Sequence, residues 1–497
     1  MTTSLRDLLT GLTSIQEHWD MPISGLALDS RSVVSGDAFI ALAGSNQHGL
    51  MHVEQAIKNR ASAVIFDPAG NGRQLADALP GRVSSLVPML AVENLGLKLG
   101  ELAARFYHNP SKSMTIIGIT GTNGKTSCSQ FLSQMLDDCG IIGTLGWGQW
   151  GQLCKTQNTT PDALVIQKIL TELLANKKRT VAMEVSSHGL QQGRVNGVAF
   201  KGAVFTNISR DHLDYHGTMD AYLQAKLALL TKPGLIFAVV NLDDSYSEQI
   251  ITAVPEAVQL WQFSAKGKNS DSGECINAEN VLHKADGIQF DVRWRNDLRQ
   301  VNVPLFGDFN VENILAVLTV MLALGISLHE AAAKLTAIKP VVGRMERFGT
   351  ESDPLIFVDY AHTPDALDKV LSSLRKHCKQ DLWVVFGCGG NRDAGKRSQM
   401  GEIAEHWADH VIITDDNPRY ENGLDIVNAI LAGCSAAKVE VIQNREQAIQ
   451  KVISSAAKHD CIVIAGKGHE DYQESNGVRL PFSDRQVVIN ALLRRNT

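Results

Sequence analysis

The sequence lacks several features that would each assign a protein to a class. Its eight cysteines include no C-x-x-C pair, so they predict neither a disulfide framework nor a zinc site. No apolar run approaches membrane-spanning length, and Arg6, Asp7 and Glu17 interrupt the start, which argues against a signal peptide. The net charge of −6 offers no basic footprint for nucleic acid. We therefore expect a cytoplasmic protein that binds neither membranes nor nucleic acid.

The composition is that of a globular protein, with 44% hydrophobic and 20% charged residues in a chain of 497. No internal repeat or low-complexity segment is evident. The chain is too long for one core, and its length predicts roughly three domains. We place these at residues 1–90, 91–338 and 339–497.

Strand and helix patterns alternate through most of the chain, which predicts an α/β fold with largely parallel sheets. The first domain is expected to be small and α/β, and a helix at 93–107 leads from it into the next. The second is a phosphate-loop domain whose residues 255–305 add antiparallel strands, before a helix at 309–324. The third is Rossmann-like. Expected strands lie at 36–44, 63–66, 89–92, 180–185, 202–208, 235–242, 354–358, 382–386, 410–414 and 461–465.

The stretch Thr115–Thr126 predicts a strand, then a glycine-rich turn, and then a helix that begins with the pair Lys-Thr. This order is typical of a phosphate-binding loop, in which backbone N–H groups and a helix N-terminus face the anion. Lys125 would reach the outer phosphates, and the Thr126 hydroxyl could hold Mg²⁺. One departure is Ile119, which stands where the usual G-x-x-x-x-G-K-[ST] pattern has glycine. The alternative is an ordinary glycine turn between strand and helix.

Acid and imidazole groups follow two further strands of the second domain. Glu184 ends one strand, and Asp211-His212 follows another. Because Mg²⁺ prefers oxygen ligands and binds few protein groups beside phosphates, Glu184 suits it well and His212 less so. The alternative is that these polar residues only cap the strands. His212 and His216 are four residues apart, which is a weak indication of zinc.

Polar loops also follow three strands of the third domain. Gly387–Arg392 resembles a dinucleotide fingerprint, but Arg392 stands where glycine is needed, so NAD is not expected. A turn that presents Arg392 to a carboxylate or phosphate is the better interpretation, with a plain loop as the alternative. Asp416–Arg419 and Gly466–Glu470 follow the other two strands. This mixture of cations, amides and acids fits a zwitterionic ligand.

Six blocks in this order resemble the Mur ligases, the ATP-dependent amide-forming enzymes of peptidoglycan synthesis. They are Thr120–Thr126 (TGTNGKT), Glu184–His188 (EVSSH), Asp211–His216 (DHLDYH), Gly343–Glu346 (GRME), Asp359–His362 (DYAH) and Asp416–Arg419 (DNPR). Asp29–Arg31 and Gly466–Glu470 extend the likeness across nearly the whole chain. The displaced glycine of the phosphate loop is the family's own variant, so it supports the resemblance.

The resemblance implies roles at the matching positions. ATP would be bound by Gly121, Thr122, Asn123, Gly124, Lys125, Thr126, Ser127, Asn310, Asn313, Arg344, Asp359 and His362. A UDP-linked substrate would be bound by Leu28, Ser30, Ser45, Asn46, Gln47, Asn158, Thr159, Thr160, Ser186, Gln192 and Arg194. The incoming amino acid would be bound by Arg392, Asp416, Asn417, Pro418, Arg419, Gly466 and Glu470. Mg²⁺ would be held by Thr126, Glu184, His212 and Lys226, the last as a carbamate.

The implied reaction adds meso-diaminopimelate to the D-glutamate of UDP-MurNAc-L-Ala-D-Glu. ATP phosphorylates the carboxylate, the amine attacks the acyl phosphate, and phosphate leaves. Catalysis is expected from Lys125, Lys226, His212 and Arg344, because the charge on the transferring phosphoryl group must be offset. Domain closure would exclude water from the acyl phosphate. The expected protein is a monomer.

Three other functions stay open at this point. The same ligase could use L-lysine in place of diaminopimelate. A folylpolyglutamate synthetase shares the TGTNGKT loop, although Asp29–Arg31 and Asp416–Arg419 argue against it. A nucleotide-dependent switch or binding protein would lack ligase chemistry altogether, and the carboxylate-and-arginine edge of the third domain argues against that function.

Overall fold

The computed structural model describes residues 2–44, 47–79, 86–269, 272–284, 286–435 and 439–495. The chain forms two compact units. The first unit comprises Met1–Gly118, Asp138–Ala203 and Ala225–Ile236, and the second comprises Ile119–Asp137, Val204–Gln224 and Phe237–Thr497. Each unit is described by itself below. Three elements have residues in both units: β7 (Thr115–Thr120), β12 (Gly202–Phe205) and α10 (Met219–Leu227).

A four-stranded parallel sheet forms the N-terminal part of the first unit. Its order is β3 (Gly25–Ala27), β4 (Asp37–Ala41), β5 (Ala63–Phe66) and β6 (Met89–Ala91). Alternate residues of β4 and β5 enter two separate cores. Both faces are therefore covered, which explains why these strands read as continuous apolar runs. The other elements here are β1 (Thr3–Ser4), α1 (Leu5–Leu9), η1 (Glu17–Trp19), β2 (Pro22–Ile23), η2 (Gly49–His52), α2 (Val53–Lys58) and α3 (Gly72–Asp77).

The remainder of the first unit pairs strands around β11 (Thr180–Glu184). This strand is parallel to β8 (Cys139–Gly143), which is antiparallel to β9 (Gly146–Gln149), and β9 pairs with β10 (Gln152–Cys154). Helix α5 (Leu95–Phe106) packs against α7 (Ala163–Ala175), where Asp162 caps the first turn. Two short elements complete this part, η3 (Pro110–Ser113) and α8 (Ser187–Gln191).

The second unit opens with α6 (Lys125–Met135) and continues into strands that begin parallel and end antiparallel. β13 (Phe237–Asn241) is parallel to β14 (Gln259–Ser264), and β14 to β15 (Glu274–Lys284). β16 (Gly287–Trp294) and β17 (Asp297–Val303) then form an antiparallel meander with β15. The antiparallel addition is thus confirmed, but β14, which we expected in it, belongs to the parallel part. The helices here are α9 (Leu213–His216), α11 (Ser247–Thr252), α12 (Asp308–Ala323), α13 (Leu328–Lys334) and η4 (Leu335–Ala337).

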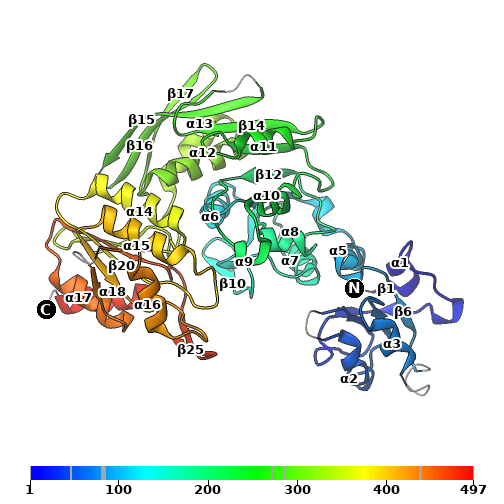
Figure 1. Ribbon diagram of the computed structural model, residues 1–497. Coiled ribbons are helices and arrows are strands. Elements are labelled where there is room, and N and C mark those ends of the chain that lie inside the picture. The colour runs from blue at the N-terminus through cyan, green and yellow to red at the C-terminus, as the bar shows by residue number, and fades with distance from the viewer. Residues whose placement is uncertain are drawn as a thin grey trace. The chain divides into compact units, whose positions relative to one another are not determined.

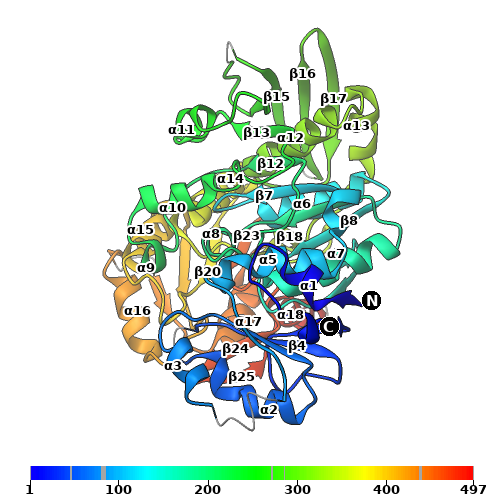
Figure 2. The same ribbon diagram turned by 90° about the vertical axis from the view of Figure 1, so that its right-hand side faces the viewer.

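A six-stranded sheet carries the C-terminal part of the second unit (Figure 1; Figure 2). Its order is β18 (Glu346–Phe348), β19 (Leu355–Asp359), β23 (Cys461–Ala465), β20 (Leu382–Phe386), β21 (His410–Ile413) and β22 (Val439–Val441). All neighbours are parallel except β18. Its helices are α14 (Pro364–His377), α15 (Lys396–Trp407), α16 (Gly423–Leu431), α17 (Arg445–Ser455) and α18 (Asp484–Arg495), and β24 (Tyr472–Ser475) and β25 (Val478–Pro481) form a hairpin.

The parallel strands of this sheet place three predicted loops at one edge. Strands β23, β20 and β21 are neighbours, and each of the three loops follows one of them. Because parallel strands share one carboxyl edge, these loops meet there. Among the described residues, no helix is long and apolar enough to cross a membrane.

Candidate active site

The phosphate loop, Gly121–Gly124, joins β7 to α6 as the sequence predicts. Gly121 has φ +144°, and a Cβ there would lie 1.9 Å from Thr206 Oγ1, so only glycine fits. The Lys125 ammonium donates to the carbonyl oxygens of Gly121 and Thr122, at 2.8 and 2.9 Å. The lysine therefore lies over the loop, next to the backbone that would receive phosphate.

Hydrogen bonds from Thr206, Asn207 and Asp365 hold this loop through Asn123. Asn207 accepts from the Asn123 backbone N–H at 3.0 Å and donates to the Asn123 carbonyl at 3.2 Å. Thr206 donates to the same carbonyl at 2.6 Å. The Asn123 side chain in turn donates to Asp365 of α14 at 3.0 Å. We did not predict Asn207 or Asp365 as site residues, and Asn207 fell inside the strand expected at 202–208.

A pocket adjoins the loop within the second unit. Apolar side chains of Phe309, Ala366 and Val370 line it, together with polar groups. The polar lining includes the predicted residues Asn123, Gly124, Ser127, Asn313, Arg344 and Asp359, and also Asn207, Glu312, Tyr360 and Lys369. Such a mixture of apolar walls and few convergent polar groups is typical of a small-molecule site.

Two of the predicted ATP residues lie beside this pocket without lining it. Asn310 accepts from the side chain of Asn313 at 3.1 Å and donates to the Phe306 carbonyl at 2.7 Å, so it orients Asn313. The His362 ring contacts the Tyr360 carbonyl through Nδ1 at 2.9 Å. Burial is the main cause of the lowered pKa of His362, which favours its neutral form.

Arg344 connects the loop to the C-terminal sheet. Its guanidinium donates to Thr126 Oγ1 at 3.3 Å and lies over the Tyr360 ring at 4.5 Å. Asp359, at the end of β19, accepts from the backbone N–H groups of Met345 and Ala361 at 2.7 and 2.8 Å. Burial raises the pKa of Asp359, and the charge of Arg344 opposes that rise.

Asp211 and His212 lie in the second unit, as does Thr126. The His212 Nε2 is 3.4 Å from Asp211 Oδ2, and His212 has a left-handed backbone with φ +55°. Burial opposes ionisation of Asp211, but His212 and further neighbouring basic side chains outweigh it and hold the pKa of Asp211 low. Those further side chains are His362, Lys396 and Lys125. Asp211 thus stays ionised within a basic surrounding.

The predicted residues near β11 form a network in the first unit. The buried Glu184 carboxylate accepts from the Thr144 backbone and hydroxyl at 3.0 and 2.9 Å. Thr144 also contacts Thr159 at 2.9 Å, and Thr160 donates to the Glu184 carbonyl at 2.9 Å. Further contacts join Thr160 to the Ser186 N–H and to Arg194, and Arg194 to Gln192. Asn158 is exposed, and Lys226 is fully buried on α10.

The remaining predicted residues of the first unit follow its N-terminal strands. Ser30 is buried, and its carbonyl accepts from Asn59 at 2.9 Å. Gln47 contacts the His52 ring at 2.9 Å, and Leu28 is half-buried after β3. The predictions for Ser45 and Asn46 fall outside the described residues.

The loops after β20, β21 and β23 contact one another. Asn417 donates to Glu470 at 2.9 Å, and the Arg419 guanidinium donates to the Gly390 carbonyl at 2.8 Å. Arg392 is exposed on the same loop as Gly390, and Asp416 is buried. The residues we expected at one edge are therefore brought together.

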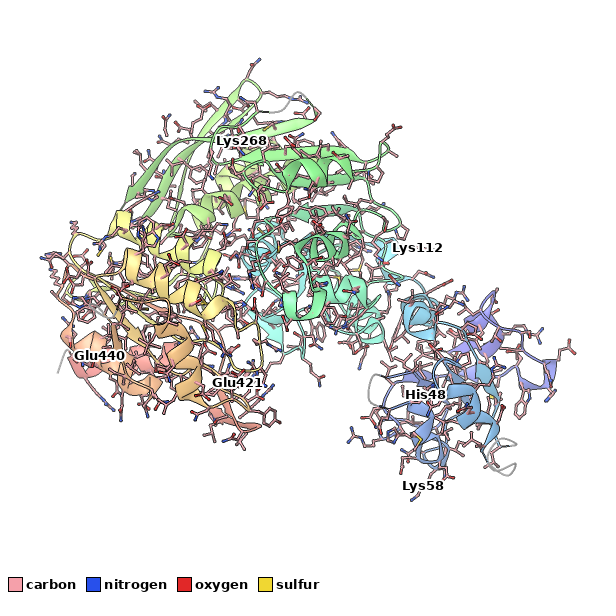
Figure 3. The ribbon with its side chains drawn as sticks, in the orientation of Figure 1. His48, Lys58, Lys112, Lys268, Glu421 and Glu440 are labelled. Atoms are coloured by element: carbon pink, nitrogen blue, oxygen red, sulfur yellow. The ribbon has the colours of Figure 1, made fainter. Side chains whose placement is uncertain are left out.

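A buried arginine that the sequence did not single out supports these loops. Arg397 of α15 pairs with Glu421 at 2.9 Å and contacts the Gly389 carbonyl at 3.4 Å. Glu421 is labelled in Figure 3. Glu421 also accepts from the Asn391 backbone. This contact spans the turn that carries Arg392, so Arg397 holds the turn in place.

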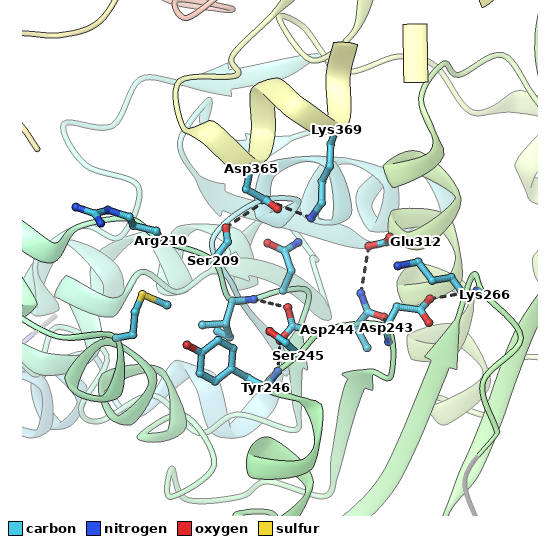
Figure 4. Close-up of a pocket in the computed structure, with 14 residues that line it drawn as sticks. Ser209, Arg210, Asp243, Asp244, Ser245, Tyr246, Lys266, Glu312, Asp365 and Lys369 are labelled. Atoms are coloured by element: carbon cyan, nitrogen blue, oxygen red, sulfur yellow. Dashed lines mark hydrogen bonds and ion pairs between the residues drawn. The ribbon is translucent and has the colours of Figure 1, made fainter. Parts of the chain in front are cut away.

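A second, more polar pocket of about 490 Å³ adjoins the first and shares Asn207, Glu312 and Lys369 with it. Figure 4 shows Asp365 accepting from Ser209 and pairing with Lys369, at 3.2 Å each. Burial raises the pKa of Glu312, which lines both pockets. Among the described residues, no group of three or more His, Cys, Asp or Glu could hold a metal ion.

Family models match three segments of the chain. The family descriptions "Mur ligase family, catalytic domain", "Mur ligase middle domain" and "Mur ligase, glutamate ligase domain" match residues 22–107, 119–321 and 343–468. A ligase of Pseudomonas aeruginosa, UDP-N-acetylmuramoyl-L-alanyl-D-glutamate--2,6-diaminopimelate ligase, is 45% identical over 482 residues, covering 96% of each chain.

Solved structures show the same fold. A structure of UDP-N-acetylmuramoyl-L-alanyl-D-glutamate--2,6-diaminopimelate ligase matches with a TM-score of 0.70 and 35% identity, covering 100% of both chains. A Mycobacterium tuberculosis folylpolyglutamate synthase complexed with ADP and AMPPCP has a TM-score of 0.63 at 18% identity, over 75% of this chain and 92% of that one. At that identity the likeness shows the fold alone.

The fold, the phosphate loop and the matched family define an ATP-binding enzyme, an ATP-dependent ligase that forms amide bonds. The chain belongs to the Mur ligase family. The three matched segments agree with the predicted three-domain α/β architecture, while the boundaries at residues 90 and 338 stay predictions.

Proposed function

We propose that this ligase joins meso-diaminopimelate to the D-glutamate of UDP-N-acetylmuramoyl-L-alanyl-D-glutamate, in the synthesis of a peptidoglycan precursor. One observation carries the proposal: Arg392, Asn417, Arg419 and Glu470 gather at one edge of the C-terminal sheet. This set offers cations for carboxylates and an acid for an ammonium group. The near-full-length likeness to a ligase of that name supports it.

The nucleotide half of the reaction would use the phosphate loop and its pocket. The base would lie against Phe309, Ala366 and Val370, with Asn313 to read its polar edge. Lys125 would pair with the terminal phosphates and Arg344 with the phosphoryl group in transfer. The substrate carboxylate attacks the γ-phosphorus, the bond to the ADP oxygen breaks, and an acyl phosphate and ADP result.

The amide half would follow at the C-terminal edge. The unprotonated amine of diaminopimelate attacks the acyl carbon, and the tetrahedral intermediate expels phosphate. Arg419 would bind the carboxylate at the far end of the amino acid, and Glu470 an ammonium group. Gly466, Asp416 and Pro418 would shape the loops around the ligand.

Mg²⁺ fits the chemistry of the donors on the second unit only as a phosphate-bound ion. Thr126 offers a hydroxyl oxygen and His212 an imidazole, which is too small a set to hold Mg²⁺ without phosphate oxygens and water. The ion would neutralise phosphate charge. Glu184 and a carbamylated Lys226 belong to the first unit, and their part in metal binding stays a prediction.

The UDP-linked substrate is assigned to the first unit. We propose that Ser30 and Gln47 contact the nucleotide and that Thr160, Ser186 and Arg194 contact the peptide end. Leu28, Ser45, Asn46, Asn158, Thr159 and Gln192 complete the proposed set. Because ATP and UDP-sugars are made in the cytoplasm, we place the reaction there, and we propose a monomer.

The deciding experiment measures ADP release and product mass with UDP-MurNAc-L-Ala-D-Glu and one amino acid at a time. We expect an amide product with meso-diaminopimelate and little with L-lysine. Folate-stimulated ATP hydrolysis would favour the folylpolyglutamate alternative. Nucleotide binding without any amide product would contradict ligase activity of this kind.

A further inference from the structure

Lys467 is a lysine with no solvent exposure, in the loop after β23. Burying an ammonium group is costly unless it is paired and hydrogen-bonded. Its ammonium lies 3.0 Å from Asn417 Oδ1 and 3.0 Å from Glu470 Oε2, and 5.5 Å from the centre of the Tyr472 ring. The cation is therefore held by two residues that we assign to amino-acid binding.

These contacts decide the orientation of the Asn417 amide. Asn417 Oδ1 accepts from Lys467 and also from the Glu474 backbone N–H at 2.9 Å. Its Nδ2 must then be the donor, and one N–H goes to Glu470 Oε2 at 2.9 Å. A flipped amide would bring its NH₂ group against the lysine ammonium. Lys467 thus leaves the second N–H of Asn417 available to an acceptor such as a substrate carboxylate.

The same contacts orient the Glu470 carboxylate. Lys467 and Asn417 both donate to Oε2. In the described part of the chain no hydrogen bond to Oε1 is seen, so this oxygen is the one left to accept from a substrate ammonium group. Lys467 has no exposed surface, whereas Asn417 is 2% exposed and Glu470 is half-buried, so the lysine would act on the substrate through these two residues.

We infer that Lys467 is a positioning residue of the amino-acid site. It fixes the Asn417 amide and the Glu470 carboxylate so that one presents an N–H and the other an oxygen to the zwitterionic substrate. This inference rests on the proposed function, because Asn417 and Glu470 must bind the amino acid. It predicts that loss of Lys467 weakens the binding of the amino acid but not the binding of ATP or of the UDP-linked substrate.

The test is steady-state kinetics of Lys467→Met against each of the three substrates. We expect KM for meso-diaminopimelate to rise about 10- to 100-fold, the range found when a hydrogen-bonding partner that orients a metal-binding side chain is removed. KM for ATP and for the UDP-linked substrate should stay within about threefold, and kcat should fall less than KM rises. The matched control is Lys451→Met, an exposed lysine paired with Glu440, which should change none of these values.

A second variant keeps the inference testable if the methionine variant does not fold. Lys467→Gln retains a hydrogen-bond donor without the charge and should give an intermediate rise in KM for the amino acid. In a Glu470→Gln background, removing Lys467 should matter less than in wild type, because the pair is coupled. That dependence is not expected of a residue that only stabilises the fold.

The possible results distinguish the role inferred for Lys467 from the proposed function of the enzyme. An unchanged KM for diaminopimelate, or an equal rise in all three KM values, would overturn the role of Lys467 while wild-type amide synthesis still stands. A wild-type enzyme that forms no amide with diaminopimelate would instead refute the proposed function. The wild-type assay is therefore run first.

Discussion

Arg419 is expected to decide between diaminopimelate and L-lysine, which differ by one carboxylate at the far end. The structure holds Arg419 in a left-handed conformation with φ +54°, between its backbone contact to the Glu474 carbonyl at 3.0 Å and its guanidinium contact to Gly390. That guanidinium contact uses Nη1. Nε and Nη2 can then bind a carboxylate in a bidentate manner, which is geometrically specific.

The expected size of this discrimination follows from the half-buried position of Arg419. With lysine as the substrate, Arg419 would be partly desolvated and would face no carboxylate. The penalty should be about 2–4 kcal/mol, which is roughly 30- to 1,000-fold in kcat/KM. Arg419→Ala should lose most of that preference, mainly through weaker use of diaminopimelate.

The assay is kcat/KM for both amino acids in wild type and in Arg419→Ala. Arg479→Ala is the control, since this arginine lies on the neighbouring hairpin, is mostly exposed and pairs with Glu474. The control should keep the wild-type ratio. Comparable use of lysine by the wild type, or the same ratio in Arg419→Ala, would refute the reasoning. Arg392 could also hold a carboxylate of this ligand, so the double variant tests whether the two arginines are coupled.

Four further outcomes are expected. Lys125→Ala should abolish amide formation and leave binding of the UDP-linked substrate intact by calorimetry, and lost binding in a folded variant would contradict this. Lys226→Ala should be nearly inactive and partly rescued by short carboxylic acids, whereas a fully active variant would exclude a carbamate. Arg445→Met should lower the free energy of unfolding by about 3–5 kcal/mol, because it leaves the fully buried Asp484 unpaired, and Arg445→Met/Asp484→Leu should recover part of it. Burial, together with the charge of His283, lowers the pKa of His377 to about 4. The neutral form of His377 therefore contributes stability above pH 6.5 that is lost as pH falls toward 4. In thermal melts, His377→Gln should be destabilised less by acid than the wild type, and an unchanged dependence of Tm on pH would contradict this.

Sequence patterns predicted the bounds of a strand well where the strand has a neighbouring strand on each side in the sheet. The runs at 382–386 and 461–465 coincide with β20 and β23, because central parallel strands are apolar without interruption. The edge strands β18 and β22 were not predicted, since each has only three residues, half-buried in β18 and mostly exposed in β22, and such short strands carry little periodicity. β14 was assigned to the wrong kind of pairing because strand residues do not encode the direction of their neighbour.

Motifs identified the phosphate loop and the three C-terminal loops, but not the side chains that hold them. Asn123 and Asp365 are 242 positions apart, and Arg397 of α15 reaches Glu421 in the loop after β21. A motif indicates which strand end carries chemistry. It does not indicate which distant residue completes a hydrogen bond, and Lys467 became informative only once its burial was known.

In the second unit, the proposed ATP site and the proposed amino-acid site are linked through neighbouring strands. Asp359 ends β19 and Gly466 follows β23, and the Gly466 N–H donates to the Asp359 carbonyl at 3.1 Å. The Tyr360 ring lies under Arg344 and 5.0 Å from the His469 ring, in the loop that carries Glu470. A residue proposed to act on the phosphoryl group and a loop proposed to bind the amine thus share one aromatic side chain. Because an acyl phosphate must meet the amine before water does, this direct connection is what such a reaction requires.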